Sequence, residues 1–337
     1  MIPMGCRNSE RLNYTITQEG FDSLASHWAD PGYPLRWDIL FTLPAWLEVW
    51  WHELRSGGEL YQSAVRRNEE IIGIAPLLIN RKKASIVGSA DVCDYLDFVV
   101  APGMEREFFN VLLDELSEKS IERLDLGPVR PDSTVLTQLA PIAQERGYEV
   151  LCHPEDVSLE MTLPPTWEEY LSSLSGKQRH EVRRKLRRLW EAGQIDYRIE
   201  KDIASVNGAM DIFLKMFTES RKDKADFLTP RMESFFRSLA KKTAEVGLLR
   251  LGTLQVDGLP AAMLLCFDYN DCLYLYNSAY NPEYDALSVG LLSKILCIKE
   301  SIKQGKRRFD FLKGKEGYKS RLGGQQVPLY RCRITIR

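Results

Sequence analysis

The sequence lacks a hydrophobic run long enough to cross a membrane. Its longest uninterrupted apolar stretches are the nine-residue segments Ile71–Ile79 and Leu259–Phe267, whereas a membrane-spanning helix needs about 18–20 such residues. The first residues mix charged and polar side chains without an apolar core segment, so we expect no secretory signal. These absences predict a cytoplasmic protein without a transmembrane segment.

Clusters of metal-binding side chains are also missing. The seven cysteines form no C-x-x-C pair, and only four histidines occur. Zinc sites and disulfide frameworks usually show regular spacings of these residues. The sequence therefore predicts neither a bound metal nor a disulfide framework.

Four common catalytic motifs are absent as well. The patterns G-x-x-x-x-G-K-[ST], G-x-G-x-x-G, H-E-x-x-H and G-x-S-x-G do not occur, which argues against kinase, NAD-dependent, zinc-protease and serine-hydrolase functions. The composition is otherwise ordinary, with 44% apolar and 27% charged residues, as is typical of a folded globular protein. A chain of 337 residues is long enough for two domains with separate cores.

Positive charge is unevenly distributed, although 45 basic residues nearly balance 47 acidic ones. Residues 177–193 hold seven Lys and Arg against two Glu, and residues 299–337 hold twelve against three acids. Such local positive potential is typical of a surface that binds an anion, although solvated basic faces are also common. An anionic ligand of the second half of the chain is therefore expected.

The segment 177–193 is predicted to be a helix with Val182 and Leu186 on its apolar face. Four arginines would then lie on neighbouring faces of the helix, opposite Val182 and Leu186, and they are Arg183, Arg184, Arg187 and Arg188. A nucleotide phosphate, an anionic lipid surface and RNA all fit such a helix. Nucleic acid is the least favoured, because stacking aromatic side chains are lacking apart from Trp190.

The first half of the chain predicts a mixed sheet flanked by helices. Alternating apolar residues predict strands, and apolar residues at helical spacing predict helices. The expected elements are an aromatic helix at Trp46–Trp51, strands at Tyr61–Val65, Ile71–Ile79, Ile86–Gly88 and Tyr95–Val100, a helix through Phe108–Leu116, a strand at Ile121–Leu126, a helix at Val135–Arg146, and strands at Tyr148–Cys152 and Val157–Leu163.

Pro164 and Pro165 predict a hinge that divides the chain into residues 1–163 and 164–337. The second half repeats the first in outline, because both have an antiparallel hairpin leading into a strand, a helix and a parallel strand. Its expected helices are Trp167–Leu171, Lys177–Gly193, Ala209–Ser220, Met232–Glu245 and Leu287–Gln304, and its expected strands are Ile195–Ile199, Gly247–Val256, Ala261–Asp268, Cys272–Ala279, Phe309–Leu312 and Leu329–Ile336. The fold class is therefore α/β, with a mixed, mostly antiparallel sheet in each half.

Three segments carry a resemblance to known proteins. They are Leu43–Trp51, the stretch S-G-K-Q-R-H-E-V-R-R-K-L-R-R-L at 175–189, and Gly305–Gly323 with its F-D-F-L-K-G and Y-K sequences. The element order over residues 247–312 resembles the core of the Gcn5-related N-acetyltransferase (GNAT) fold. The three segments together resemble the BioF2-like, or cellulose-biosynthesis-associated (CelD/BcsL-type), acetyltransferases, which are similar to the FemAB peptidyltransferases. The resemblance implies two GNAT-like domains in tandem and N-acyl transfer.

The resemblance also implies where the acyl donor binds. In the GNAT fold a helix start holds the donor pyrophosphate, because its free N–H groups and its dipole attract an anion. This start corresponds to Leu287, Ser288, Val289 and Gly290, so we expect acetyl-CoA or another acyl-CoA there. The preceding loop departs from the Gln/Arg-x-x-Gly-x-Gly/Ala pattern of the wider superfamily, and Ser288 by itself would be an ordinary N-cap.

Asp310, Tyr318 and Lys319 are the expected catalytic residues. Asp310 lies between two phenylalanines of a strand and should project alone to one side, where it could orient the amine or accept its proton; a structural salt bridge is the alternative. The resemblance places Tyr318 and Lys319 beside the donor, where Lys319 could stabilise an oxyanion and Tyr318 could protonate a thiolate or simply pack. Lys319 is expected in a Gly-flanked loop that does not support the core, so its replacement should leave folding intact. The alternative is that Lys313, Lys315, Lys319 and Arg321 form one solvated loop.

Five further residues are expected to contact the substrate, and they are Tyr95, Asp97, Arg184, Tyr276 and Lys313. The first domain is predicted to be a wall of the acceptor cleft, because Pro102 lacks an amide donor where a phosphate cradle would be needed. The preferred function is acyl transfer from acyl-CoA to an amine on a sugar or another cell-envelope precursor. The alternatives are an aminoacyl-tRNA-dependent transferase of the FemX type, for which the usual helical-hairpin arm is not evident, and a non-catalytic module of envelope biosynthesis that binds anionic partners.

Overall fold

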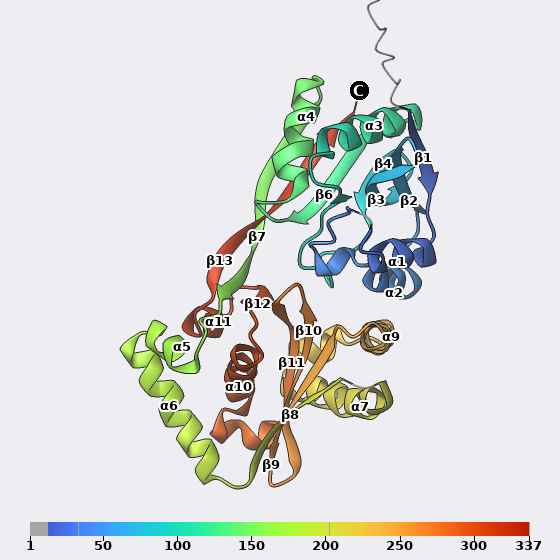
Figure 1. The fold of residues 1–337 in the computed structure, drawn as a ribbon. Coiled ribbons are helices and arrows are strands. Elements are labelled where there is room, and N and C mark those ends of the chain that lie inside the picture. The colour runs from blue at the N-terminus through green and yellow to red at the C-terminus, as the bar shows by residue number, and fades with distance from the viewer. Residues whose placement is uncertain (1–12, 33, 202, 337) are drawn as a thin grey trace, which may run out of the picture.

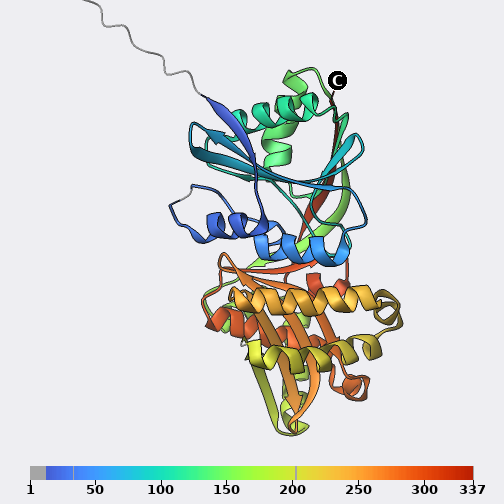
Figure 2. The ribbon, with the colours of Figure 1, turned by 90° about the vertical axis from the view of Figure 1, so that its right-hand side faces the viewer.

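One continuous sheet runs through both halves of the molecule (Figures 1 and 2). The computed structural model describes residues 13–32, 34–201 and 203–336. Within these ranges the strands form a 13-stranded sheet in the order β1-β2-β3-β4-β6-β13-β7-β12-β11-β10-β9-β8, with β5 paired to β3 off this path. No helix among the described residues is both long and apolar enough to cross a bilayer.

The first half places helices on both faces of its part of the sheet (Figure 2). Its elements are β1 (Tyr14–Gln18), α1 (Phe21–Ala29), η1 (Leu40–Thr42), α2 (Pro44–Leu54), β2 (Glu59–Arg67), β3 (Glu70–Asn80), β4 (Lys83–Ile86), β5 (Val99–Val100), α3 (Glu105–Glu118), β6 (Arg123–Val129), η2 (Val135–Leu139), α4 (Ala140–Glu145) and β7 (Glu149–Thr162). As expected, the aromatic helix α2 belongs to the core, where Trp46 is 1% exposed. It contacts the second half through Glu53, whose carboxylate accepts a hydrogen bond from Ser238.

The second half has the same kind of layered arrangement. Its elements are α5 (Trp167–Ser173), α6 (Gly176–Glu191), β8 (Ile195–Glu200), α7 (Ile203–Ser220), α8 (Lys222–Phe227), α9 (Pro230–Glu245), β9 (Leu249–Val256), β10 (Leu259–Tyr269), β11 (Cys272–Tyr280), η3 (Pro282–Leu287), α10 (Val289–Lys303), β12 (Arg308–Lys313), α11 (Gly317–Arg321) and β13 (Gln325–Thr335). Apolar side chains of α10 belong to one core cluster with those of α5 and α6, whereas those of α7 and α9 belong to the cluster that continues into the first half. The sheet therefore separates two cores.

Two strands join the halves. The predicted strands Tyr148–Cys152 and Val157–Leu163 are one continuous strand, β7, because β13 pairs with it from Glu149 to Glu160, across the predicted gap at residues 153–156. The last strand also begins earlier than predicted and lies between β6 and β7. Since this strand from the end of the chain pairs with the first half, the division at residues 163 and 164 stays a prediction.

Other local differences concern the first half. Only Val99–Val100 of the predicted strand Tyr95–Val100 pairs as a strand. The Leu96 amide donates to the Pro128 carbonyl, and the Asp97 carboxylate accepts hydrogen bonds from Thr134, directly before η2. Cys152 and Cys332 form a disulfide between β7 and β13. The expectation of no disulfide was therefore wrong for this pair. The two cysteines lie 180 residues apart in sequence, and only the register of β13 against β7 places them opposite each other.

Candidate active site

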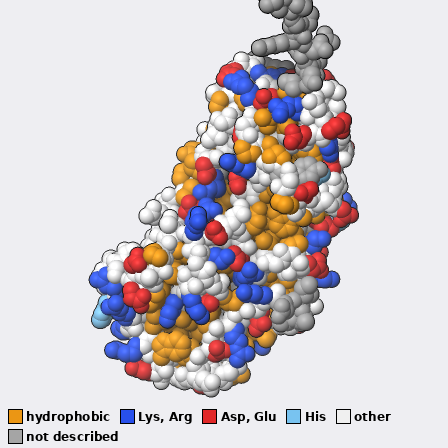
Figure 3. All heavy atoms as spheres, in the orientation of Figure 1, with side chains coloured by type: hydrophobic (Ala, Val, Ile, Leu, Met, Phe, Trp, Pro, Cys, Tyr) orange, Lys and Arg blue, Asp and Glu red, His pale blue; other side chains and the backbone are white. Residues whose placement is uncertain are grey.

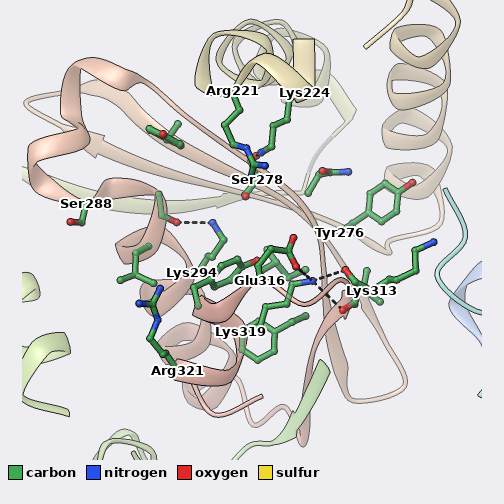
Figure 4. A pocket seen from close by; sticks show the side chains of 18 of the residues that line it. Arg221, Lys224, Tyr276, Ser278, Ser288, Lys294, Lys313, Glu316, Lys319 and Arg321 are labelled. Atoms are coloured by element: carbon green, nitrogen blue, oxygen red, sulfur yellow. Dashed lines mark hydrogen bonds and ion pairs between the residues drawn. The ribbon is translucent and has the colours of Figure 1, made fainter. Parts of the chain in front are cut away.

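The two central strands of the second half separate as the GNAT resemblance implies. β11 and β12 pair in parallel only from Cys272–Tyr274 to Arg308–Asp310, although β11 continues to Tyr280. A cavity of about 560 Å³ occupies the gap beyond the paired stretch. It is lined by β11, β12, α11 and the start of α10, and by Arg221 and Lys224 from the opposite side (Figure 4).

The start of α10 forms the wall where an anion was expected. Ser288 has left-handed backbone angles (φ 57°, ψ 36°) between η3 and α10, and its side chain does not cap the helix. The first N–H groups of a helix have no carbonyl one turn back, so the amides after Ser288 are suited to bind an anion. Ser288 and Gly290 line the cavity, whereas Val289 is buried in the core and Leu287 packs against it.

Gly290 allows this helix start to approach the sheet closely. A Cβ atom at this position would come within 3.1 Å of Tyr280 Cδ1 on β11, which is tighter than ordinary contact. Glycine is therefore favoured here by space, and the helix start lies directly against the strand that lines the cavity.

Helix α6 reaches the same corner through Lys185, not through Arg184. Lys185 Nζ donates a hydrogen bond of 2.5 Å to Ser288 Oγ. Arg184, the predicted substrate residue, instead donates hydrogen bonds to both carboxylate oxygens of Glu181 on its own helix. The structure thus places Lys185 at the start of α10, where the donor phosphates are expected, and leaves Arg184 outside this position.

Lys294, which is buried, and Lys224, which is partly buried, line the cavity and escaped the sequence analysis. Lys294 Nζ donates to the Gly290 carbonyl at 2.7 Å, and burial, followed by the charge of Lys224, lowers the pKa of Lys294 to about 7. Lys224 donates to the Ser278 carbonyl, and burial, followed by the charge of Arg221, lowers its pKa to about 8. A bound anion would favour the charged form of both. The available signal was a lysine within the apolar helix α10.

The end of β12 contains the predicted Asp310 in a closed hydrogen-bond network. Asp310 is 1% exposed, while Phe309 and Phe311 point into the core of the opposite face as predicted. Its carboxylate accepts hydrogen bonds from Tyr95 Oη (2.6 Å), Ser158 Oγ (3.3 Å) and the Leu312 amide (2.7 Å). Burial raises the pKa of Asp310 against the effect of these donors. The structure thus brings Asp310 and Tyr95 into contact, next to the residues of β12 that line the cavity.

The expectation that Lys319 lies in a loop was wrong, and so was the alternative of a solvated loop. Lys319 lies on α11 and is 3% exposed. Its ammonium donates to the carbonyls of Leu312 (3.2 Å) and Lys313 (2.6 Å) and pairs with Glu316 at 3.0 Å (Figure 4). Because a buried ammonium that holds two carbonyls supports the local backbone, Lys319 positions the end of β12 while also lining the cavity.

Tyr318 and Tyr276 line the cavity as well. The Lys294 ammonium lies 5.1 Å from the centre of the Tyr318 ring, and burial, followed by the Glu316 charge, raises the Tyr318 pKa. Tyr276 donates a 3.0 Å hydrogen bond to the Val92 carbonyl and packs among aromatic rings such as Trp46. Tyr318 therefore keeps its proton at neutral pH, and Tyr276 ties the cavity to the first half.

Asp94 is the acid that sequence reasoning missed. It lines the cavity from the first half and accepts a 3.3 Å hydrogen bond from the amide of the predicted residue Lys313. Burial raises the pKa of Asp94 to about 6, against the charge of Lys313. Lys313 also lines the cavity, and its ammonium donates to the Ala90 carbonyl.

Asp97 lies apart from this cavity. It caps η2 by accepting hydrogen bonds from the amide (2.7 Å) and hydroxyl (2.6 Å) of Thr134. Tyr95 and Asp97 line a second, polar cavity of about 570 Å³ between the halves. A substrate contact of Asp97 therefore stays a prediction, beside a structural role that the hydrogen bonds define. Among the described residues no group of His, Cys, Asp and Glu is arranged to hold a metal ion.

Most of the second half matches a known family. Residues 176–320 match the family model described as an acetyltransferase (GNAT) domain, and this match supports acyl transfer in general. The predicted α/β fold, a mixed and mostly antiparallel sheet flanked by helices, is confirmed.

Solved structures share this fold at low sequence identity. FemX superposes with a TM-score of 0.64 at 14% identity, covering 94% of this chain and 96% of FemX. A conserved protein of unknown function from Bacteroides thetaiotaomicron gives 0.56 at 11% identity, with 86% and 89% covered. The C-terminal domain of a putative lysylphosphatidylglycerol synthetase from Agrobacterium fabrum gives 0.53 at 10% identity, with 78% and 80% covered. A search of curated proteins found no significant match.

Proposed function

We propose that this protein transfers an acyl group from acyl-CoA to a primary amine. The observation that carries the proposal is the cavity between the diverging strands β11 and β12, which is closed by the start of α10. Acyl-CoA placed there would have its phosphates at the helix start and its thioester carbonyl near the end of β12. The family match over residues 176–320 supports the same reaction class.

The donor side of the cavity is basic. In the proposal, the amides after Ser288 bind the pyrophosphate, and Lys185 adds a cation beside them. Lys294 and Lys224 lie further in and gain favourable charge interactions when the donor binds. Fixed donors and cations of this kind bind an anion without reorganisation.

The acceptor side contains Asp94. In the proposed reaction the amine nitrogen attacks the thioester carbonyl carbon, its proton passes to Asp94, and the carbon–sulfur bond breaks. Tyr318 supplies a proton to the leaving thiolate. Asp94 suits this role because it lines the cavity and its raised pKa of about 6 leaves a carboxylate at neutral pH that is a better base than an ordinary aspartate.

Asp310, Tyr95 and Lys319 are proposed as positioning residues. They hold the bulge at the end of β12, where Leu312 has a positive φ of 61°, and this bulge forms the cavity wall behind the expected carbonyl. Lys319 is proposed to position the backbone and not to contact the oxyanion, because its ammonium already binds Leu312, Lys313 and Glu316.

The acceptor class is the finer part of the proposal. We propose an amine on a sugar or another cell-envelope precursor, in keeping with the resemblance to BioF2-like acetyltransferases, and a cytoplasmic enzyme that needs no metal. Asp94 lines the cavity from the first half, and Tyr276 of the second half donates a hydrogen bond to the Val92 carbonyl of the first. These contacts support the proposal that the first half forms the acceptor wall of the cavity. A FemX-type reaction from aminoacyl-tRNA is the second candidate, supported by the likeness of fold to FemX.

Turnover assays separate these possibilities. The full chain is incubated with acetyl-CoA and a panel of amino sugars, and free thiol release is followed, with Asp94→Asn as the inactive control. Thiol release that depends on an amino sugar supports the proposal. Amine modification only with charged tRNA would favour the FemX-type reaction, and no transfer from either donor would favour the non-catalytic module.

A further inference from the structure

One long face of α6 is basic and exposed to solvent. Lys177, His180, Arg183 and Arg187 are exposed along this face, with the Arg187 side chain 72% exposed. Figure 3 shows Lys and Arg side chains gathered along the edge where α6 runs. Lys177 and Arg183 form no ion pair with other described residues, and Arg187 is 3.8 Å from Glu191. The face therefore keeps a positive charge that the protein does not neutralise.

Exposed apolar side chains lie at the lower end of the same helix. Trp190, in the last turn of α6, is 51% exposed, and Leu259 is 61% exposed. The hairpin between β9 and β10 contacts the end of α6 through Gln194 and Asp257, whose backbones are joined by a 2.8 Å hydrogen bond. Large exposed apolar groups are costly in water, and the two elements that carry them, the end of α6 and the β9–β10 hairpin, lie at the same end of the molecule (Figure 1).

A groove of about 530 Å³ runs beside Trp190 between α5, α6 and α10. Trp167, Ile195 and Leu296 supply its apolar lining, and Lys299 and Lys303 add cations. The Lys299 ammonium lies 5.7 Å from the Trp167 ring centre. Asp196 and Glu300 line the groove too, and Glu300 lies 3.6 Å from Lys303, so the groove contributes apolar walls beside the basic face of α6 and little net charge of its own.

We propose that the surface made of the α6 face, Trp190, Leu259 and this groove docks onto an anionic phospholipid bilayer. Arginines and lysines are attracted to anionic headgroups, and tryptophan is favoured at the headgroup level. An exposed leucine at a hairpin tip gains free energy in hydrocarbon and gains nothing from nucleic-acid phosphates. Trp167 is stacked on Tyr170 with ring centres 5.2 Å apart, so it offers no free platform for a nucleotide base.

Docking in this way would bring the candidate active site near the membrane. The inner side of α6 contacts the segment before α10: Lys185 hydrogen-bonds to Ser288, and Arg188 hydrogen-bonds to the Ala286 carbonyl (3.4 Å). The helix would therefore have lipid on one side and the donor site on the other. An acceptor anchored in the membrane could then reach the cavity, although the docking itself does not depend on the proposed acyl transfer.

Vesicle binding of the full chain, without any substrate, tests the inference. The protein is mixed with phosphatidylcholine vesicles that contain or lack phosphatidylglycerol, and the bound fraction is measured by flotation. Arg183→Glu/Arg187→Glu should weaken binding to the anionic vesicles by about tenfold or more, since each basic residue near the surface contributes noticeably, and Leu259→Ser should weaken it further. The matched control is Arg81→Glu/Lys241→Glu, two exposed residues outside the proposed surface, with circular dichroism to check folding.

The expected result is binding that needs phosphatidylglycerol, decreases with added salt, and survives in the control but not in the α6 variant. Equal binding to neutral vesicles, no binding at low salt, or equal loss in both variants would overturn the inference. A preference for tRNA over anionic vesicles in competition would also overturn it, in favour of nucleic acid.

Discussion

Tyr95 and Asp310 lie 215 residues apart in sequence, yet the Tyr95 hydroxyl donates a 2.6 Å hydrogen bond to the Asp310 carboxylate. Both side chains are almost fully buried. The bond joins the irregular segment before β5 to the end of β12, next to the proposed acceptor side of the cavity. It makes the geometry of the second half depend on the first.

Replacing Tyr95 with Phe should destabilise the protein. The change leaves Asp310 buried with two donors instead of three, and losing a hydrogen bond to a buried polar group costs about 1–3 kcal/mol. Urea unfolding measures this loss. Tyr14→Phe is the control, because the Tyr14 hydroxyl has no hydrogen bond with other described residues. Equal unfolding midpoints for the two variants would show that the Tyr95 bond contributes little.

Lys319→Met should lower both stability and activity. Methionine keeps the length of the side chain but leaves the carbonyls of Leu312 and Lys313 without their donor, so the free energy of unfolding should fall by about 1–3 kcal/mol. Lys315→Met, at an exposed position just before α11, serves as the control. A Lys319→Met protein with wild-type unfolding and a reduced maximal rate would instead assign Lys319 to direct contact with the reacting group.

Asp94 should determine the acidic limb of the pH–rate profile. Because its raised pKa is about 6, protonation below that pH removes the proposed base, and kcat/KM should fall as the pH drops through about 6. Asp94→Asn should lose about 10²–10⁴ in rate together with this limb. Steady-state kinetics from acidic to neutral pH measure both. An Asp94→Asn enzyme with a normal rate and an unchanged profile would place the base elsewhere.

Lys185 and Arg184 are neighbours on α6 with different expected effects. Lys185→Ala removes the cation at Ser288 and should raise the KM for acyl-CoA by about tenfold, as for the loss of a charge-assisted hydrogen bond. Arg184→Ala should change it much less, because Arg184 does not line the cavity and hydrogen-bonds to Glu181, whereas Lys185, 3.5 Å from the same carboxylate, also reaches Ser288. A larger effect for Arg184 would mean that the donor lies along the outer face of the helix.

Much of the fold could be predicted from sequence because local patterns specify it. The hairpin β9–β10, the helix α10 and the strand with alternating Phe309 and Phe311 follow from periodicity and turn residues. The continuous strand β7 could not be predicted, because it depends on pairing with β13, a contact of residues far apart in sequence. The same reason explains the missed disulfide between Cys152 and Cys332.

Gly290 lies at the start of a helix and Asp310 on a strand, as the sequence predicted, and their functional roles stay predictions. Lys319 was predicted in a loop because its three partners are brought together only when the chain turns after β12. Asp94 and Lys224 were missed because each reaches the cavity from a segment with no motif. Charge and burial at these positions are properties of the assembled fold.

Hydrogen–deuterium exchange of the full chain with and without coenzyme A tests most directly the central claim that the acyl donor binds at the start of α10. The account predicts slower exchange of the amides from Leu287 to Lys294 when coenzyme A is present, with little change at residues 101–107 in the first half. Protection confined to residues 101–107, or no protection in either segment at saturating coenzyme A, would contradict it.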